Sequence, residues 1–252
     1  MDNFIFDMQN VTYTKKNIKY IDDITFNLKE GESLIIFGPE NSGMTNLFDL
    51  IIQASPEYEG DIIYKGKSTK SLDYFEQLMH KRDIGYVNRD YGLLSNMTVE
   101  QNISLPLEYH STLSVSKIKE HVESIISLLD LDHCKKLRPM DLTDSEVLKT
   151  VFGRAIVMDP DLLYIEHAFK INCPLNIRQI HDFLIKRSEQ SDKSLVIITY
   201  YPQDFVDISD SFIMFYDGSI VFNGGRDDFI NSDNPYLIQY KNNSIKGPME
   251  IL

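Results

Sequence analysis

The chain is poor in cysteine, in long apolar runs and in positive charge. Only two cysteines occur in 252 residues, Cys134 and Cys173, and their spacing matches neither a disulfide framework nor a metal site. Although His133 precedes Cys134, no second pair of ligands lies nearby in the sequence, so we predict a surface or core role and no metal. Low cysteine use is typical of a protein of the reducing cytosol.

No apolar stretch approaches the ~20 residues that a membrane-spanning helix needs. The longest runs, such as Ser33–Phe37 and Leu195–Thr199, have the length of β-strands. The residues Met1–Phe6 lack the charged-then-apolar pattern of a signal peptide. We therefore expect a cytoplasmic protein that reaches a membrane only where another protein holds it.

Acidic residues outnumber basic ones by 38 to 25, which gives a net charge of -13. This charge argues against a general nucleic-acid binder, because such proteins need a basic face. It also opposes direct binding to an anionic membrane surface. Otherwise the composition, with 42% hydrophobic and 25% charged residues, is ordinary for a globular domain.

The clearest pattern in the chain is an altered phosphate-binding loop. Residues Gly38 to Thr45 read Gly-Pro-Glu-Asn-Ser-Gly-Met-Thr and keep the spacing of G-x-x-x-x-G-K-[ST], but Met44 stands where the lysine belongs. That lysine normally meets the β- and γ-phosphates. A predicted strand before the loop and a predicted helix after it provide the context that a phosphate loop requires.

Periodicity supplies the other predicted elements. Alternating apolar and polar residues predict antiparallel strands early in the chain, and two fully apolar runs predict a parallel sheet covered on both faces. Asp217-Gly218 predicts a hairpin turn. The predicted strands are Phe4–Tyr13, Ile24–Leu28, Leu34–Phe37, Gly60–Tyr64, Asp83–Val87, Leu162–Ile165, Leu195–Thr199, Phe212–Tyr216 and Ile220–Asn223. The predicted helices are Thr45–Gln53, Leu72–His80, Val99 to about Leu131 and Asp144–Met158, and the tail from Asn234 shows little periodicity.

This order of elements resembles the ATP-binding subunit of an ABC transporter over nearly the whole chain. The resemblance implies an α/β fold: a P-loop ABC-type ATPase domain with an antiparallel β subdomain, a parallel-sheet core and a helical subdomain. It implies one domain over residues 1–252, with the helical subdomain and signature region at about 96–158 and a C-terminal extension at about 234–252. In that family two subunits sandwich ATP head to tail, with the phosphate loop of one facing the signature motif of the other.

The resemblance assigns a nucleotide-binding role to the phosphate loop, but the loop is altered. Glu40 adds a negative charge, while Gly38, Ser42, Gly43 and Thr45 remain to attract an anion weakly through the backbone and the following helix. Thr45 is positioned to reach a magnesium ion. Tyr13 is placed either to stack on an adenine, as the family's aromatic does, or to serve as a sheet residue.

The signature motif L-S-G-G-Q is altered as well, and reads Leu142-Thr143-Asp144-Ser145-Glu146. Glycines in the motif let backbone amides approach the γ-phosphate. Asp144 and Glu146 would instead present carboxylates to that phosphate. The alternative is that the segment begins a helix with Thr143 or Asp144 as N-cap, and both interpretations can hold together.

Further family positions carry other residues. Arg89 replaces the Q-loop glutamine, although a surface arginine paired with Asp90 is the simpler interpretation. The remaining positions are Glu166 for the Walker B aspartate, His167 for the catalytic glutamate, Tyr200 for the switch histidine, and Asn172-Cys173-Pro174 for the D-loop. Because general-base catalysis contributes roughly 10²–10⁴-fold, these replacements predict a pseudo-ATPase with no catalytic residue. We expect no cofactor, and at most weak ATP and magnesium binding.

Two segments narrow the resemblance to the ATPases of MCE-type phospholipid transporters of bacterial envelopes, the Mla system. They are Leu105–His110 with Leu113-Ser114, and the tail Asn234–Tyr240 with Lys246–Pro248. In that branch the tail reaches the neighbouring subunit and helps to hold the dimer together. The alternative for the tail is a disordered terminus.

The resemblance therefore implies a structural or regulatory subunit of an MCE-type lipid transporter, peripheral at the inner membrane. It would form a homodimer, or a heterodimer with another ABC subunit, and would bind no nucleic acid. Tyr91, Leu93 and Leu94 lie where the family docks the membrane permease, although the two leucines are equally placed to be core residues. The alternatives are a divergent active ATPase that uses His167 to energise lipid transport, and a soluble nucleotide or anion sensor.

Overall fold

The computed structural model describes residues 4–52, 57–88, 92–169 and 174–250. Contacts within the chain divide it into two compact units. Unit 1 comprises Met1–Lys81 with Ser194–Leu252, and unit 2 comprises Arg82–Lys193. The predicted helical subdomain, 96–158, lies within unit 2.

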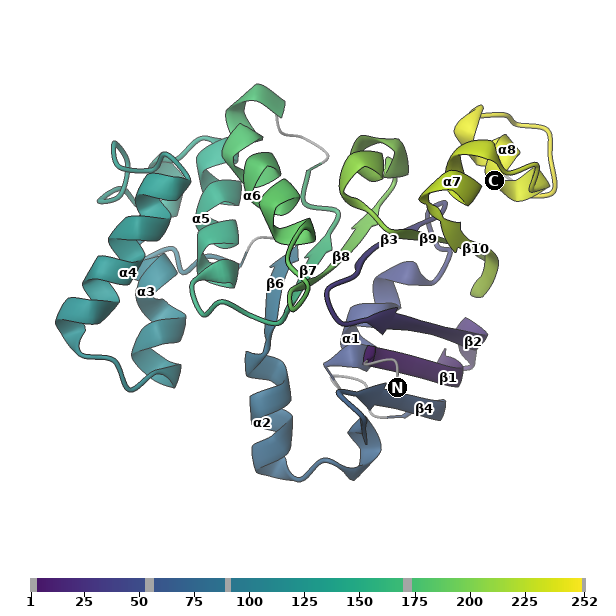
Figure 1. Cartoon of the computed structure of the whole chain (residues 1–252), viewed down its shortest axis with the longest axis horizontal. Coiled ribbons are helices and arrows are strands. Elements are labelled where there is room, and N and C mark those ends of the chain that lie inside the picture. The colour runs from purple at the N-terminus through teal and green to yellow at the C-terminus, as the bar shows by residue number, and fades with distance from the viewer. Residues whose placement is uncertain (1–3, 53–56, 89–91, 170–173, 251–252) are drawn as a thin grey trace. The chain divides into compact units, whose positions relative to one another are not determined.

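Unit 1 contains an antiparallel sheet with the strand order β2-β1-β4-β5 (Figure 1). Alternate residues of β1, among them Phe6 and Met8, are fully buried, as the period-2 pattern requires. Lys16 and Asn17 both have positive φ and form the two-residue turn between β1 and β2. The strands are β1 (Phe4–Lys15), β2 (Ile18–Lys29), β4 (Glu59–Tyr64) and β5 (Lys67–Ser68).

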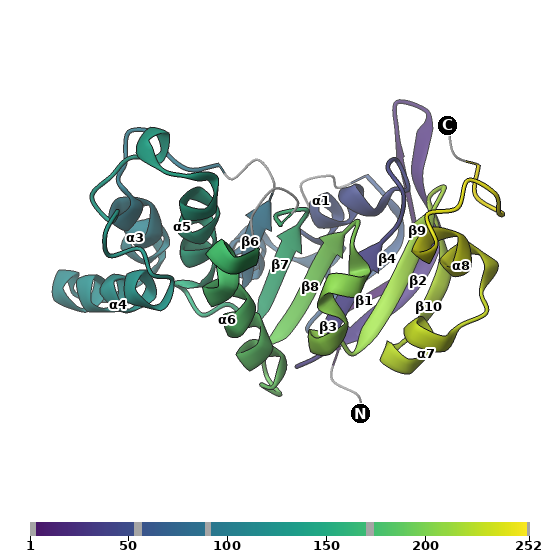
Figure 2. The ribbon, with the colours of Figure 1, turned by 90° about the horizontal axis from the view of Figure 1, so that it is seen from above.

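The second set of strands in unit 1 surrounds β3 (Ser33–Phe37), which is buried along its whole length. It pairs in parallel with β8 (Ser194–Thr199) on one side and β9 (Ser211–Tyr216) on the other (Figure 2). The strand β10 (Ser219–Gly225) pairs antiparallel with β9. The turn Asp217-Gly218 has positive φ at both residues, so the predicted hairpin is confirmed.

The helix after the phosphate loop is shorter than predicted. The 3-10 turn Met44–Asn46 precedes α1 (Leu47–Ile51), so the helix predicted over Thr45–Gln53 is wrong at its start. Thr45 and Asn46 have low helix propensity, which favours the tighter turn. The other helices of unit 1 are α2 (Tyr74–Arg82), which ends at the boundary with unit 2, α7 (Arg226–Asn231) and α8 (Pro235–Lys241), with 3-10 turns at Thr69–Ser71 and Pro202–Ile208.

The tail forms an ordered structure against unit 1, as α7 and α8 beside β9 and β10 show (Figure 2). The Asn234 side chain caps α8 by accepting from the N–H groups of Tyr236 and Leu237. The Gln239 side chain, 3% exposed, donates to the Met249 carbonyl and accepts from its N–H at 3.0 and 2.7 Å. The alternative of a disordered terminus is therefore wrong for residues 234–250, and periodicity missed α8 because the helix is so short.

Unit 2 pairs β6 (Ile84–Asn88) in parallel with β7 (Leu162–Glu166) and packs α3 against α4 and α5 (Figure 1). The helix predicted from Val99 to about Leu131 is wrong at 111–114. Ser111 and Ser114 have extended backbones that end α3 and begin α4. The helices are α3 (Val99–His110), α4 (Val115–Leu128), α5 (Asp144–Ile156) and α6 (Arg178–Ser188), with 3-10 turns at Pro139–Asp141 and Pro174–Ile177. Within the described ranges, no helix has the length and hydropathy to cross a bilayer.

Candidate functional site

The phosphate loop of unit 1 is held by close backbone packing. Gly43 has φ +97, and a Cβ there would overlap the Tyr20 carbonyl of β2. A Cβ on Gly38 would overlap the Phe215 carbonyl of β9. The Gly218 N–H donates to the Ser42 carbonyl at 3.0 Å, which ties the loop to the β9–β10 hairpin. Both glycines are therefore required by the fold itself, whether or not the loop holds an anion.

Met44, at the position of the missing lysine, is 1% exposed and belongs to the core. The neighbouring Ser42 hydroxyl is buried and has no hydrogen-bond partner among the described residues, which suits an anion oxygen or a water. However, Gly38 to Thr45 include no lysine or arginine, and Glu40 is exposed beside the loop. The loop therefore offers an anion the Ser42 hydroxyl and backbone amides, but no positive charge of its own that would offset a triphosphate.

The tail contacts the first residue of the same loop through Tyr240. The Tyr240 hydroxyl lies 2.9 Å from the Tyr200 carbonyl and 3.2 Å from the Gly38 carbonyl, and the Tyr240 ring is 5.4 Å from that of Phe37. Burial raises the pKa of Tyr240 above its ordinary value, so the hydroxyl stays a donor. Tyr200, at the switch position, is thus joined to the loop through α8. The sequence analysis singled out the tail Asn234–Tyr240, but nothing in its spacing indicated that Tyr240 contacts the phosphate loop.

Tyr13 is 3% exposed and packs with its ring 6.2 Å from that of Tyr20. A base stacks only on a ring face that it can reach, so this burial favours the sheet-residue interpretation of Tyr13. Stacking on an adenine stays a prediction without support from the geometry.

In unit 2 the residues at the Walker B positions, Glu166 and His167, lie among side chains of the same unit. The Glu166 carboxylate accepts a hydrogen bond from the Tyr86 hydroxyl at 2.6 Å. His167 follows β7 with φ +48 and is 8% exposed. A general base must lie within hydrogen-bond reach of the water it activates, and this burial disfavours that role for His167.

The signature-like segment begins α5. Thr143 is its N-cap, as one of the two predicted alternatives had it: the Thr143 hydroxyl accepts from the Glu146 N–H, and the Thr143 N–H donates to Glu146 Oε2 at 2.8 Å. The carboxylate of Glu146 is thus turned back onto its own helix, and its presentation to a phosphate stays a prediction. Asp144 is exposed in the first turn, while Leu142 and Ser145 are half-buried.

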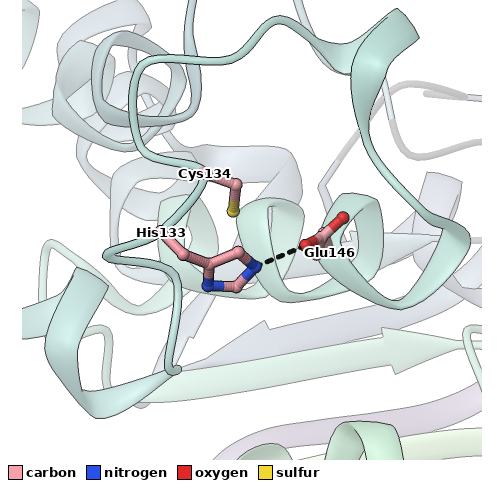
Figure 3. A group of neighbouring side chains, drawn as sticks. All are labelled: His133, Cys134 and Glu146. Carbon is pink, nitrogen blue, oxygen red and sulfur yellow. Dashed lines mark hydrogen bonds and ion pairs between the residues drawn. The ribbon is translucent and has the colours of Figure 1, made fainter.

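The other oxygen of Glu146 meets the His133–Cys134 pair (Figure 3). His133 Nε2 lies 2.6 Å from Glu146 Oε1, and the Cys134 sulfur points toward the imidazole and the carboxylate. Burial would raise the pKa of the Glu146 carboxyl, but hydrogen bonds from Thr143 and His133 outweigh burial and lower it. Burial, with the nearby Glu146 charge, raises the pKa of the Cys134 thiol to about 11. Nothing in the spacing of the residues indicated that Glu146 joins this pair.

The segment at the permease-docking position is fixed to the helices of unit 2. The buried Asn102 side chain of α3 accepts from the Leu94 N–H at 2.8 Å and donates to the Leu94 carbonyl. Arg154 of α5 donates to the Gly92 carbonyl at 2.8 Å. Leu94 is 41% exposed and Leu93 is half-buried. Arg89 and Tyr91 lie outside the described residues, as do Asn172 and Cys173 of the D-loop.

Comparison with known proteins agrees with this architecture. Residues 21–169 match the protein family described as ABC transporter. The intermembrane phospholipid transport system ATP-binding protein MlaF of Haemophilus influenzae is 21% identical, over 99% of this chain and 94% of its own length. The glucose import ATP-binding protein GlcV of Saccharolobus solfataricus is 26% identical, over 90% of this chain and 64% of its own length.

Among solved structures, a dimeric ATP-binding cassette in a post-hydrolysis state with ADP and phosphate has a similar fold. It superposes with a TM-score of 0.79 at 22% identity, over 88% of this chain and 98% of its own. This likeness confirms the predicted fold class, an α/β cassette with an antiparallel sheet, a mixed parallel sheet and helices.

Proposed function

This chain belongs to the ABC transporter family as an ATP-binding subunit, and from that premise we propose that it is a catalytically degenerate one. In this proposal it serves as a structural or regulatory component of an MCE-type envelope lipid transporter. It dimerises, docks the membrane permease and hydrolyses no ATP.

The observation that carries the proposal is the burial of Met44. A lysine that meets phosphate must end in the hollow of the loop, whereas Met44 is 1% exposed and packs in the core. Loss of one charge-assisted contact to phosphate typically costs about 1.5–3 kcal/mol of binding free energy. The exposed Glu40 adds repulsion. The loop is thus built as part of the fold, with little left that favours a triphosphate.

The signature side supports the same conclusion. In the head-to-tail dimer that the family implies, a partner's phosphate loop would face Thr143–Glu146 of this chain. Here the Thr143–Glu146 capping box already satisfies N–H groups at the start of α5, and Asp144 presents an exposed carboxylate. A like charge at an anion site is repulsive. The chain therefore weakens both composite sites of any dimer that it joins, including one with an active ABC subunit.

The lipid-transport part of the proposal rests on the relative that covers nearly the whole chain. MlaF is named as the ATP-binding protein of an intermembrane phospholipid transport system, and the match includes the C-terminal tail. For this chain we infer the same class of transporter and a place on the cytoplasmic face of the inner membrane. Leu94, exposed on a segment that Asn102 and Arg154 hold in place, supplies an apolar docking contact.

One observation favours a second candidate function, a nucleotide or anion sensor. The buried Ser42 hydroxyl lacks a hydrogen-bond partner among the described residues, as it would if it were placed to bind an anion oxygen. An anion bound there without turnover would leave the structural role intact. A divergent active ATPase is less well supported, because its candidate base, His167, is 8% exposed.

The test is purification of the complex from membranes with this chain as bait, followed by measurement of ATP binding and turnover. We expect a permease to co-purify and turnover to be at background. Turnover that is lost in His167→Gln of this chain would show an active ATPase and overturn the proposal.

Permease docking is tested separately. Leu94→Asp is expected to abolish co-purification, because it places a charge in an apolar contact. Leu128→Asp is the matched control, since Leu128 of α4 is 42% exposed against 41% for Leu94. Equal losses for both variants, or a complex without any membrane protein, would contradict the docking role.

A further inference from the structure

We propose that His133, Cys134 and Glu146 form a binding site for a transition-metal ion of the zinc class. The three side chains come from two segments of unit 2: the turn after α4 supplies His133 and Cys134, and the first turn of α5 supplies Glu146 (Figure 3). Their ligand atoms all lie within 4.8 Å of one another. This inference is independent of the proposed function, because it concerns neither ATP nor a permease.

The chemistry of the three ligands indicates which ion fits. Imidazole nitrogen, thiolate sulfur and carboxylate oxygen are the ligands of zinc sites, whereas magnesium and calcium take oxygen ligands. Three protein ligands leave a fourth tetrahedral position for water or a group of another molecule. Glu146 is an anionic ligand, and a bound ion would itself remove the proton of the Cys134 thiol, because metal coordination deprotonates a thiol. Lys149 is the positive charge near the sulfur.

The three ligand atoms lie within the range from which small side-chain movements would admit an ion, since all are within 4.8 Å of one another. With metal–ligand bonds of about 2.0–2.3 Å, two ligand atoms of a tetrahedral site lie about 3.3–3.8 Å apart. His133 Nε2 and Glu146 Oε1 lie 2.6 Å apart as a hydrogen-bonded pair, so an ion would have to separate them. The His133 side chain is 61% exposed, so little surrounding protein opposes the small movement that would separate its Nε2 from Glu146 Oε1.

The other two ligands are held in place by groups that do not compete for the ion. Glu146 Oε2 accepts from the Thr143 N–H and hydroxyl, each at 2.8 Å, which directs Oε1 toward the site. Such second-shell hydrogen bonds orient metal ligands. Cys134 is 1% exposed, and its backbone is fixed by bonds to Leu131 and Leu137. A bound ion would therefore join the turn before the signature-like segment to the start of α5.

The simplest competing explanation is a hydrogen-bonded His133–Glu146 pair beside a core cysteine. The two explanations differ in the role of the sulfur, since only the metal site engages the Cys134 thiolate. Cobalt(II) distinguishes them, because a thiolate ligand gives a charge-transfer absorption that a nitrogen–oxygen site does not give. Removal of the second cysteine, Cys173→Ser, leaves Cys134 as the single thiol of the chain.

The experiment titrates cobalt into the chelator-treated full chain carrying Cys173→Ser, and then displaces it with zinc. We expect one cobalt per chain with thiolate charge transfer, no such absorption in Cys134→Ser, and affinity weakened at least about tenfold in Glu146→Gln and His133→Gln. Glu146→Gln keeps the capping oxygen. His121→Gln, an exposed histidine of α4, is the control and should bind as the parent does.

Because Cys134 is buried, its replacement risks the fold, and His133→Gln carries the test if Cys134→Ser fails to fold. Absence of charge transfer in the parent chain would overturn the proposal. So would binding that His133→Gln and His121→Gln weaken equally. As a second readout, zinc should raise the melting temperature of the parent more than that of His133→Gln at the same zinc concentration.

Discussion

The phosphate loop of unit 1 and the signature-like segment of unit 2 both stand at ATP-binding positions of the family, and they differ in what they retain. The loop keeps Gly38 and Gly43, each of which lies where a Cβ would overlap a backbone carbonyl. The signature-like segment has Asp144 and Ser145 in the first turn of α5, where side chains meet no such obstacle. Glycines that the fold needs are present, whereas glycines that only a ligand needs are absent.

The two regions also differ in how polar groups are satisfied. In the loop an apolar side chain, Met44, fills the interior, and Ser42 is left with a buried hydroxyl that has no partner among the described residues. In the signature-like segment Thr143 and Glu146 satisfy each other, and Glu146 also meets His133. A new charge should therefore destabilise the phosphate loop most. The signature-like segment should be destabilised most by loss of a hydrogen bond.

The largest expected effect is that of Met44→Lys, which would place an ammonium group in the core. We expect a loss of about 3 kcal/mol or more in the free energy of unfolding, measured by urea denaturation, because burial of an unpaired charge is costly. Met44→Leu, of similar volume, should lose less than about 1.5 kcal/mol. If the Met44→Lys chain is as stable as the parent, position 44 is open to solvent. The phosphate loop would then not differ from the signature-like segment in having an apolar interior.

The next effect concerns the tail that covers the loop. Gln239→Leu should cost about 2 kcal/mol, because it leaves the N–H and carbonyl of Met249 without their buried partner. Limited proteolysis should then cleave the tail sooner than in the parent. Gln203→Leu, at an exposed position of unit 1, serves as the control. Equal protease resistance in both variants would show that the tail is held by other contacts.

A smaller effect is expected for Tyr240→Phe, which keeps the ring contact with Phe37 and removes the hydroxyl. Loss of its hydrogen bond to the Tyr200 carbonyl should cost about 1 kcal/mol of unfolding free energy. Tyr236→Phe is the comparison from the same helix. Hydrogen exchange that does not increase at residues 38 and 200 would argue that the hydroxyl does not link α8 to the loop.

The smallest expected effect is that of Thr143→Ala, which removes the N-cap of α5. Such caps contribute typically about 1 kcal/mol, and Thr143→Ser should retain most of that stability because it keeps the hydroxyl. Thermal unfolding followed by circular dichroism measures both variants. If alanine and serine behave alike, the segment is not held by its capping box, and its carboxylates are free to face a ligand.

Local chemistry in the sequence determined much of this protein. The altered phosphate loop, the Asp217-Gly218 hairpin, the buried strands and the cap at Thr143 depend on residues within a few positions of one another. For the same reason the sequence indicated the fold class and the family. Its errors in secondary structure lie at three places. A 3-10 turn precedes α1 at Met44–Asn46, serines interrupt an otherwise helical pattern at 111–114, and α8 in the tail is too short to show periodicity.

Only the tertiary structure decided the features that depend on distances between separate elements. It placed Met44 in the core, Tyr240 against Tyr200 and the phosphate loop, and Glu146 beside His133 and Cys134. None of these three contacts follows from the spacing of residues in the sequence. Glu146, for example, meets His133 and Cys134 only because the helices of unit 2 pack and bring the turn after α4 to the start of α5. A side chain's neighbours across a fold are set by that packing, and they decide whether a residue of the right type has a partner.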